Sequence, residues 1–201
     1  MRKEKEKNGG GGKKKKTLLR KPLQGRLLVS EPFLGDFYFK RSVILLADYN
    51  KDGSYGVILN KPIGVKVSDV LKDFPGLDIH LHLGGPVNVD SIFYLHTFGD
   101  EIKDSLKIMD GIYWGGDFER IKELALEKKL NDSNIRFFIG YSGWASSQLD
   151  QELKEKSWII TSTEPREIFG RRIDGLWKDT LQKMPQDYAM WINYPADPSL
   201  N

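Results

Sequence analysis

The sequence contains no cysteine, and this absence narrows the possible chemistry at once. Disulfide bonds, thiol catalysis, iron–sulfur clusters and thiolate zinc sites are all excluded. Long hydrophobic runs are also missing, because no window reaches the roughly 18 apolar residues that a membrane-spanning helix needs. The basic N-terminal stretch is not followed by the apolar run of a signal peptide. We therefore expect a cytoplasmic protein with no membrane partner.

Positive charge is present but unevenly placed. The chain of 201 residues has 31 basic and 28 acidic residues, a net charge of +3 and a pI near 8.9. Residues 1–24 contain ten basic and two acidic side chains and carry +8, which leaves −5 for residues 25–201. Four glycines beside four lysines cannot bury enough apolar surface to offset the entropy of ordering. We predict a disordered tail over 1–24 and one folded domain over 25–201. The tail is either a solvated arm or a segment that contacts an anionic partner, and any nucleic-acid binding is expected only through it.

From Gly25 onward, short apolar runs alternate with turn residues, as expected for a sheet of short strands. Asn50–Gly53 and Asp110-Gly111 predict hairpin turns, and Asp117 predicts a helix start. The predicted strands cover residues 26–30, 42–48, 55–59, 80–83, 92–96, 106–109, 112–114, 135–139 and 158–161. The predicted helices cover residues 68–74, 118–130 and 148–156, and two more begin at Thr163 and Asp174.

Hairpins mixed with helices indicate an α+β domain with a mostly antiparallel sheet, rather than a regular strand–helix–strand repeat. We expect Ser68 to cap its helix and Pro62 to end the strand before it, because proline lacks the donor of a ladder hydrogen bond. The last residues, from Asp187 on, are expected to be strand-like and then irregular.

Ser142 lies in the sequence GYSGW, between a predicted strand and a predicted helix, which is the setting of a nucleophile elbow. The match is partial, since Trp144 stands where the elbow requires glycine. No histidine follows His96, so the residue order of an α/β-hydrolase triad is excluded. Two readings stay open here: a nucleophilic Ser142 assisted by His96, or simply a tight strand-to-helix turn.

The same turn has a second possible use, as a binding site for a small polar or anionic ligand. Backbone N–H groups at a helix start attract anions, Gly143 allows close approach, and Gln148 adds a side-chain donor. The chain has no phosphate-binding glycine motif, so nothing specific indicates a nucleotide.

Asp78, His80 and His82 occupy alternate positions of a predicted strand, and two histidines with one carboxylate can bind non-haem iron. One straight strand spaces such residues about 6–7 Å apart, which is too far for a shared metal. We therefore expect ordinary alternation, with both histidines on a solvated strand face.

His96 and Arg41 are the remaining polar candidates. His96 ends the apolar strand IFYLH, where it is either a hydrogen-bonded structural residue or a proton-transfer group. Arg41 lies between Phe39 and Val43, and a guanidinium in such surroundings has either a carboxylate partner within the protein or a bound anion.

Several separated motifs carry a resemblance to a known family. The run GRLLVSEPFLGDFYFKRSVILLADYNKDGSYGVILNKP is followed in order by GGPV, SIFYLHT, GGDFERIK, RFFIGYSGWASSQLDQELKEKSWI and LWKDTL. Together they resemble the YqgE/AlgH family in its Bacteroidetes form, from Gly25 almost to the C-terminus. Many relatives have glycine or another small residue after the tryptophan and again before the glutamine, and this chain has Ala145 and Ser147 at those two positions.

The resemblance implies a bacterial α+β domain around a twisted, partly barrel-like sheet with flanking helices. AlgH-type members are proposed regulators of transcription, and no reaction is established for the family, so the resemblance implies no catalytic residue, metal or cofactor. The candidate ligand- or partner-binding residues are Arg41, Ser42, Asn60, Gly84, Gly85, His96, Ser142, Gly143, Trp144 and Gln148.

Three functions remain open on the sequence. The first is a regulatory or adaptor protein that binds a protein partner or small ligand at a cleft near Arg41, Asn60, His96 and the Gly143-Trp144 turn. The second is a hydrolase or transferase that uses His96 and neighbouring polar residues. The third is nucleic-acid binding through the basic tail.

Overall fold

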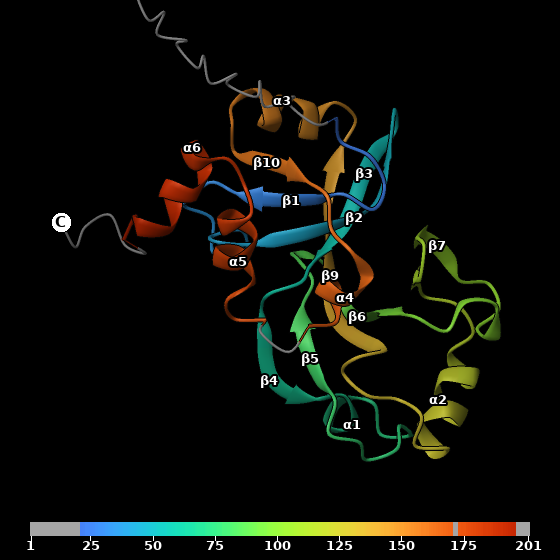
Figure 1. Ribbon diagram of the computed structural model, residues 1–201. Helices are drawn as coiled ribbons and strands as arrows, with labels where there is room; N and C mark the ends of the chain where they lie inside the picture. Colours follow the sequence, from blue (N-terminus) through green and yellow to red (C-terminus); the bar gives the residue numbers. More distant parts are fainter. Residues whose placement is uncertain (1–20, 171–172, 196–201) are drawn as a thin grey trace, which may run out of the picture.

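The computed structural model describes residues 21–170 and 173–195, shown as a ribbon in Figure 1. Most of the predicted tail and its predicted disorder lie outside these residues. Within the described part of the tail, Gln24 donates through Nε2 to the carbonyl of Lys107.

The strands form one open, mostly antiparallel sheet in the order β10-β1-β2-β3-β9-β6-β8-β7, and β5 pairs with both β4 and β9. The pairing of β5 with β9 is parallel. The strands are β1 Leu27–Ser30, β2 Val43–Asn50, β3 Gly53–Ile58, β4 Pro62–Lys66, β5 His80–Leu83, β6 Val87–His96, β7 Leu106–Met109, β8 Ile112–Trp114, β9 Ile135–Ala145 and β10 Trp158–Thr161. The α+β prediction is confirmed, and the sheet does not close into a barrel.

Short helices flank this sheet (Figure 1). They are α1 Val67–Val70, η1 Gly99–Glu101, α2 Phe118–Leu126, α3 Gln148–Lys154, α4 Pro165–Ile168, α5 Leu176–Gln182, α6 Gln186–Ala189 and η2 Met190–Asn193. The Asp117 carboxylate accepts hydrogen bonds from the N–H groups of Glu119 and Arg120, which confirms it as the cap of α2. In the described part of the chain, no helix is long and apolar enough to cross a membrane.

β9 is the strand that joins the two parts of the sheet. Its first half pairs with β6 and β5, and its last residues pair with β3. Gly140 lies at this change of partner with φ +65°, and a Cβ there would approach the Gly85 carbonyl oxygen to 2.5 Å. Glycine adopts this conformation at little cost, so β9 bends here and serves both parts.

The hydrophobic core lies on both faces of the first part of β2, which explains the unbroken apolar run at residues 43–47. Val43 and Leu45 belong to a cluster that includes Trp177 of α5. Ile44 and Leu46, on the opposite face, belong to a second cluster beneath α3. A third cluster lies between α2 and the first half of β9. A strand that is covered on both faces has no polar positions to alternate with apolar ones.

The strand before Pro62 ends at Ile58, as predicted, and Pro62 itself begins the unpredicted strand β4, where a first-residue proline sacrifices no ladder bond. The predicted start of α1 and the predicted end of α2 are wrong. Ser68 lies inside α1, whose cap is Lys66. α2 ends at Leu126 rather than residue 130, because Lys128 takes a left-handed conformation with φ +58°.

The C-terminal segment is helical, not strand-like. α6 and η2 follow one another there, and Tyr188, Trp191 and Ile192 pack against the cluster that contains Trp177. Trp191 and Ile192 lie three and four residues after Tyr188, which places these side chains on one helical face, so burial of that face favours a helix.

Candidate ligand-binding cleft

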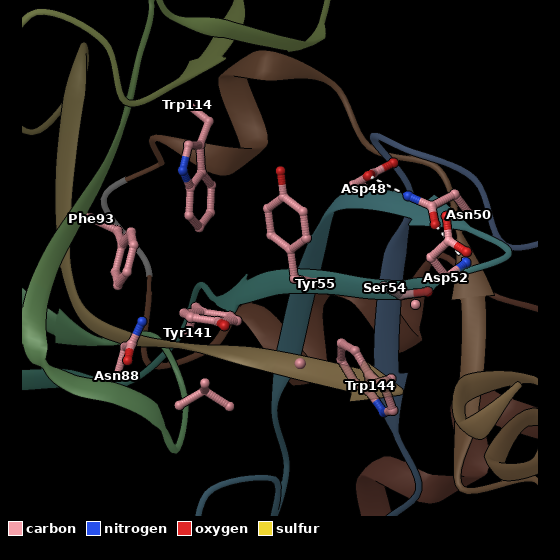
Figure 2. Close-up of a pocket in the computed structure, with 13 residues that line it drawn as sticks. Asp48, Asn50, Asp52, Ser54, Tyr55, Asn88, Phe93, Trp114, Tyr141 and Trp144 are labelled. Carbon is pink, nitrogen blue, oxygen red and sulfur yellow. Dashed lines mark hydrogen bonds between the residues drawn. The ribbon is translucent and has the colours of Figure 1, made fainter. Parts of the chain in front are cut away.

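A cleft of about 740 Å³ opens between the β2–β3 hairpin, β6, β8 and the end of β9 (Figure 2). Its walls are mainly aromatic, with acidic and amide groups at the hairpin. The lining residues are Asp48, Asn50, Asp52, Gly53, Ser54, Tyr55, Val87, Asn88, Phe93, Trp114, Tyr141, Gly143 and Trp144.

Four half-buried rings, Tyr55, Phe93, Trp114 and Tyr141, form what we call the aromatic box. Tyr55 lies 5.6 Å from Trp114 and 6.2 Å from Tyr141, centroid to centroid. Phe93 lies 5.6 Å from Trp114 and 5.4 Å from Tyr141, which closes the cycle. Each ring comes from a different strand, so the box exists only because the sheet places β3, β9, β6 and β8 side by side.

The hairpin end of the cleft is acidic. Asp48 and Asp52 line it, and the described lining residues include no lysine, arginine or histidine, while the exposed Lys51 belongs to the same turn outside the lining. The Asp48 carboxylate accepts hydrogen bonds from the Tyr49 N–H and from the Asn50 amide. Burial raises the pKa of the Tyr55 hydroxyl, and the nearby Asp48 charge acts in the same direction.

Two of the predicted residues, Gly143 and Trp144, line this cleft. Gly143 stands opposite Tyr55 in the β3–β9 pair, where the lack of a side chain leaves the space that the cleft occupies. The Trp144 indole is turned to α3, where its Nε1 donates to Glu152 at 2.8 Å. Gln148, at the first turn of α3, accepts from the Ala145 N–H and also donates to Glu152.

The predicted strand-to-helix turn at Ser142 is wrong, because β9 continues to Ala145. Ser142 is fully buried within the strand, and its hydroxyl donates to the Gly84 carbonyl at 3.0 Å. Gly84 and Gly85 lie against the backbone of β9, so closely that a Cβ on Gly84 would approach the Gly140 carbonyl oxygen to 2.2 Å. These three residues hold the β5–β6 connection onto β9.

His96 is a buried structural histidine. One ring nitrogen, Nε2, is bonded to the Gly115 carbonyl at 3.0 Å, and Nδ1 accepts from the Phe98 N–H. Burial lowers the pKa of His96. It pairs with Ile135 at the start of β9, whereas Ser142 lies seven residues further along, roughly 20 Å away in an extended strand. The structure therefore does not bring the Ser142–His96 pair together.

Arg41, Ser42 and Asn60 form a separate group, near the start of β2. The Asn60 side chain accepts from the Val43 N–H and donates to the Arg41 carbonyl. The Arg41 guanidinium lies 5.0 Å from the centroid of Trp177 and donates to the Tyr194 carbonyl. Among the described residues no carboxylate pairs with Arg41, so the predicted ion pair is not found. The Ser42 hydroxyl is buried and has no hydrogen-bond partner there.

The predicted solvated face of β5 is wrong for His82, which is 4% exposed. β5 is flanked by β4 and β9, and the His82 ring packs against Phe138 of β9 with 5.9 Å between ring centroids, so this position is not solvated. His80 is half-buried, and the exposed Asp78 pairs with Lys66. In the described part of the chain, no three histidine or acidic residues are grouped so as to hold a metal.

Sequence reasoning missed the aromatic box because its rings belong to apolar runs that are typical of core strands. Tyr55 and Tyr141 lie near glycines in a strand, a pattern that indicates open space beside a ring. Only the pairing of the strands determines which rings meet.

Known proteins resemble this chain over most of its length. A UPF0301 protein of Bacteroides fragilis is 46% identical over 90% of this chain and 92% of its own length, and one of Cytophaga hutchinsonii is 44% identical over 89% and 98%. The crystal structure of protein DIP2367 from Corynebacterium diphtheriae has the same fold, with a TM-score of 0.71 and 24% identity over 87% of this chain and 94% of its own.

The solution structure of AlgH from Pseudomonas aeruginosa superimposes with a TM-score of 0.61, at 25% identity over 73% of this chain and 80% of its own. A family model described as AlgH-like (DUF179) matches residues 27–189, which is most of the described domain. The expected family resemblance is thereby confirmed, and the chain belongs to the AlgH-like family.

Proposed function

We propose that this protein is a regulatory or adaptor protein of the bacterial cytoplasm, linked to transcription, that acts by binding a ligand or partner group in the aromatic box without chemical turnover. The observation that carries this proposal is the cleft of about 740 Å³ with the box at its centre. That volume lies within the range of small-molecule binding sites. Such sites are lined mostly by apolar side chains, with a few polar groups that orient the ligand.

The polar groups of the cleft favour binding over catalysis. A nucleophile needs a base within hydrogen-bond reach. His96 lies on the face of β6 opposite to Phe93, and both of its ring nitrogens are already bonded to backbone, at Gly115 and Phe98. Asp48, which stands opposite Tyr55 in the β2–β3 pair, already accepts two hydrogen bonds. The hydroxyl of Ser142, the candidate nucleophile considered from the sequence, donates to the Gly84 carbonyl.

Ligand binding at the box is tested by the variant Trp114→Leu. A library of metabolites is screened by thermal shift against wild type and this variant, with Phe37→Leu as the control, because Phe37 is 79% exposed and lies outside the cleft. A ligand at about 100 times its Kd stabilises the folded state by about 2.7 kcal/mol, equivalent to an increase of about 5 °C or more in Tm.

We expect such shifts in wild type and Phe37→Leu, and their loss in Trp114→Leu. Equal shifts in all three proteins would place the ligand elsewhere and contradict the proposal. The absence of any shift in wild type would contradict it as well. Circular dichroism of Trp114→Leu without ligand checks that the substitution leaves the fold intact.

A further inference from the structure

We propose that the aromatic box recognises a positively charged alkylammonium group, a ligand class that deepens the binding function proposed above and rests on it. The ligand group would carry methyl or methylene substituents on its nitrogen and would lie among Tyr55, Phe93, Trp114 and Tyr141.

The first support is the geometry of the box. Its four centroid distances lie between 5.4 and 6.2 Å, close to the sides of a square. A group at the centre of such a square is about 4 Å from each centroid, inside the roughly 6 Å over which a ring face attracts a cation. Three of the four neighbouring pairs meet at 75 to 80°, so the rings stand as walls rather than as one stack (Figure 2).

The second support is the charge beside the box. Asp48 and Asp52 lie on the Tyr55 side of the cleft in Figure 2, and the described lining residues include no basic side chain that would neutralise them. In the part of the chain that the structure describes, neither carboxylate forms a salt bridge. A cation is therefore favoured at this cleft, in contrast to the anionic ligand considered from the sequence.

The third support concerns the hydration of the cation, because the four ring faces must compensate for the water that the cation loses on binding. Ring faces offer no oxygen ligands, so a metal ion would lose its hydration without compensation. An alkylated ammonium is more weakly hydrated at its carbon substituents, and those carbons gain apolar contact with the rings. The same chemistry exists in a free quaternary ammonium compound and in a methylated lysine side chain.

The experiment compares the binding of a cation with the binding of its neutral isostere, called the neutral twin below. Choline and 3,3-dimethylbutan-1-ol have the same shape, but the second has carbon in place of the charged nitrogen. Each is titrated into the full chain, and binding is followed by NMR at the indole N–H of Trp114 and the amide of Gly143. We expect choline to bind about tenfold more tightly, the gain typical of a partly desolvated cation–π site.

Variants then separate charge from shape. Trp114→Leu keeps apolar volume but removes the ring, and we expect choline and the neutral twin to bind it with similar affinity. Trp114→Phe keeps a ring and should retain the preference. Asp52→Asn, at an exposed position, should weaken choline binding a few-fold in low salt and have little effect in high salt, because salt screens an exposed charge.

The results distinguish this inference from the function on which it rests. Equal affinity of wild type for both compounds would overturn the cation claim while the cleft remained a binding site. Undetectable choline binding in a protein that binds library compounds at the box would also overturn it, as would tighter binding of a guanidinium compound than of choline. The second arm of the experiment measures the affinity of a peptide that contains trimethyl-lysine and compares it with the affinity of choline. Tighter binding of the peptide identifies a methylated lysine side chain as the source of the group, and tighter binding of choline identifies a free quaternary ammonium compound.

Discussion

Replacement of Gly84 by alanine is expected to destabilise the protein by about 3 kcal/mol or more, which is the largest effect we anticipate from one added methyl group. The new Cβ would lie 2.2 Å from the Gly140 carbonyl oxygen and 3.1 Å from Phe138 Cβ. Neither neighbour can move freely, because Gly140 and Phe138 belong to β9 at the centre of the sheet. Urea unfolding of wild type and Gly84→Ala measures the difference in free energy.

The contacts of Gly84 show why the strands cannot simply separate. Its N–H donates to the Ile139 carbonyl, and its own carbonyl accepts from the Ile58 N–H and the Ser142 hydroxyl. A small displacement of Gly84 therefore disturbs hydrogen bonds to both β3 and β9. These contacts explain why glycine is required at position 84, in the connection between β5 and β6.

Gly76→Ala is the matched control, since a Cβ at Gly76 meets no atom within 4 Å. We expect its free energy of unfolding to change by less than about 1 kcal/mol. If Gly84→Ala does not fold, Ser142→Ala provides a milder test: loss of the hydroxyl bond to Gly84 should cost about 1 kcal/mol. Wild-type stability of both Gly84→Ala and Ser142→Ala would refute the close-approach explanation.

The second large effect is a loss of stability in acid caused by His82. Burial lowers the pKa of His82 to about 3, and the nearby Arg136 charge acts in the same direction. Neither ring nitrogen has a hydrogen-bond partner of normal geometry among the described residues. The folded protein therefore keeps this ring neutral, whereas the unfolded chain binds a proton below the ordinary pKa of about 6.5.

The sign of the effect follows from proton uptake. Between the unfolded pKa of about 6.5 and the folded pKa of about 3, unfolding takes up one proton at residue 82. The stabilisation is complete above about pH 6.5 and is lost as the pH falls towards 3, by up to about 1.4 kcal/mol per pH unit. From pH 7 to pH 4 the contribution amounts to about 3 kcal/mol.

His82→Leu isolates this contribution, because leucine fills a similar volume and does not titrate. Relative to wild type, the variant should gain about 3 kcal/mol between pH 7 and pH 4, measured by urea unfolding at each pH. His80→Gln serves as the control, since His80 is half-buried on the same strand. If wild type and His82→Leu lose stability in parallel, the neutral buried state of His82 is wrong.

Local patterns were sufficient for much of the fold. The Asn50–Gly53 and Asp110-Gly111 turns join β2 to β3 and β7 to β8, as their turn chemistry predicts. Asp117 caps α2 through its own side chain. In each case the deciding interaction joins residues a few positions apart, so the order of the residues contains the information.

Patterns failed where burial depended on a neighbouring strand. Ser142 continues a strand because β3 pairs with the end of β9, and no local feature of GYSGW specifies that pairing. His82 is buried through a tertiary contact, because its ring packs against Phe138 of the neighbouring strand β9. The residues that were predicted to share one cleft lie apart for the same reason. Arg41 bonds to Tyr194, His96 to Gly115 and Ser142 to Gly84.

The sequence by itself determined the positions of most strands, the two hairpin turns and the exclusion of thiol chemistry. The tertiary structure alone decided where a ligand can bind. Tyr55, Phe93, Trp114 and Tyr141 are far apart in the chain and come together through the strand order β3-β9-β6-β8. A binding site of this kind depends on long-range backbone pairing, and pairing partners are chosen by the packing of the whole sheet rather than by the residues beside each ring.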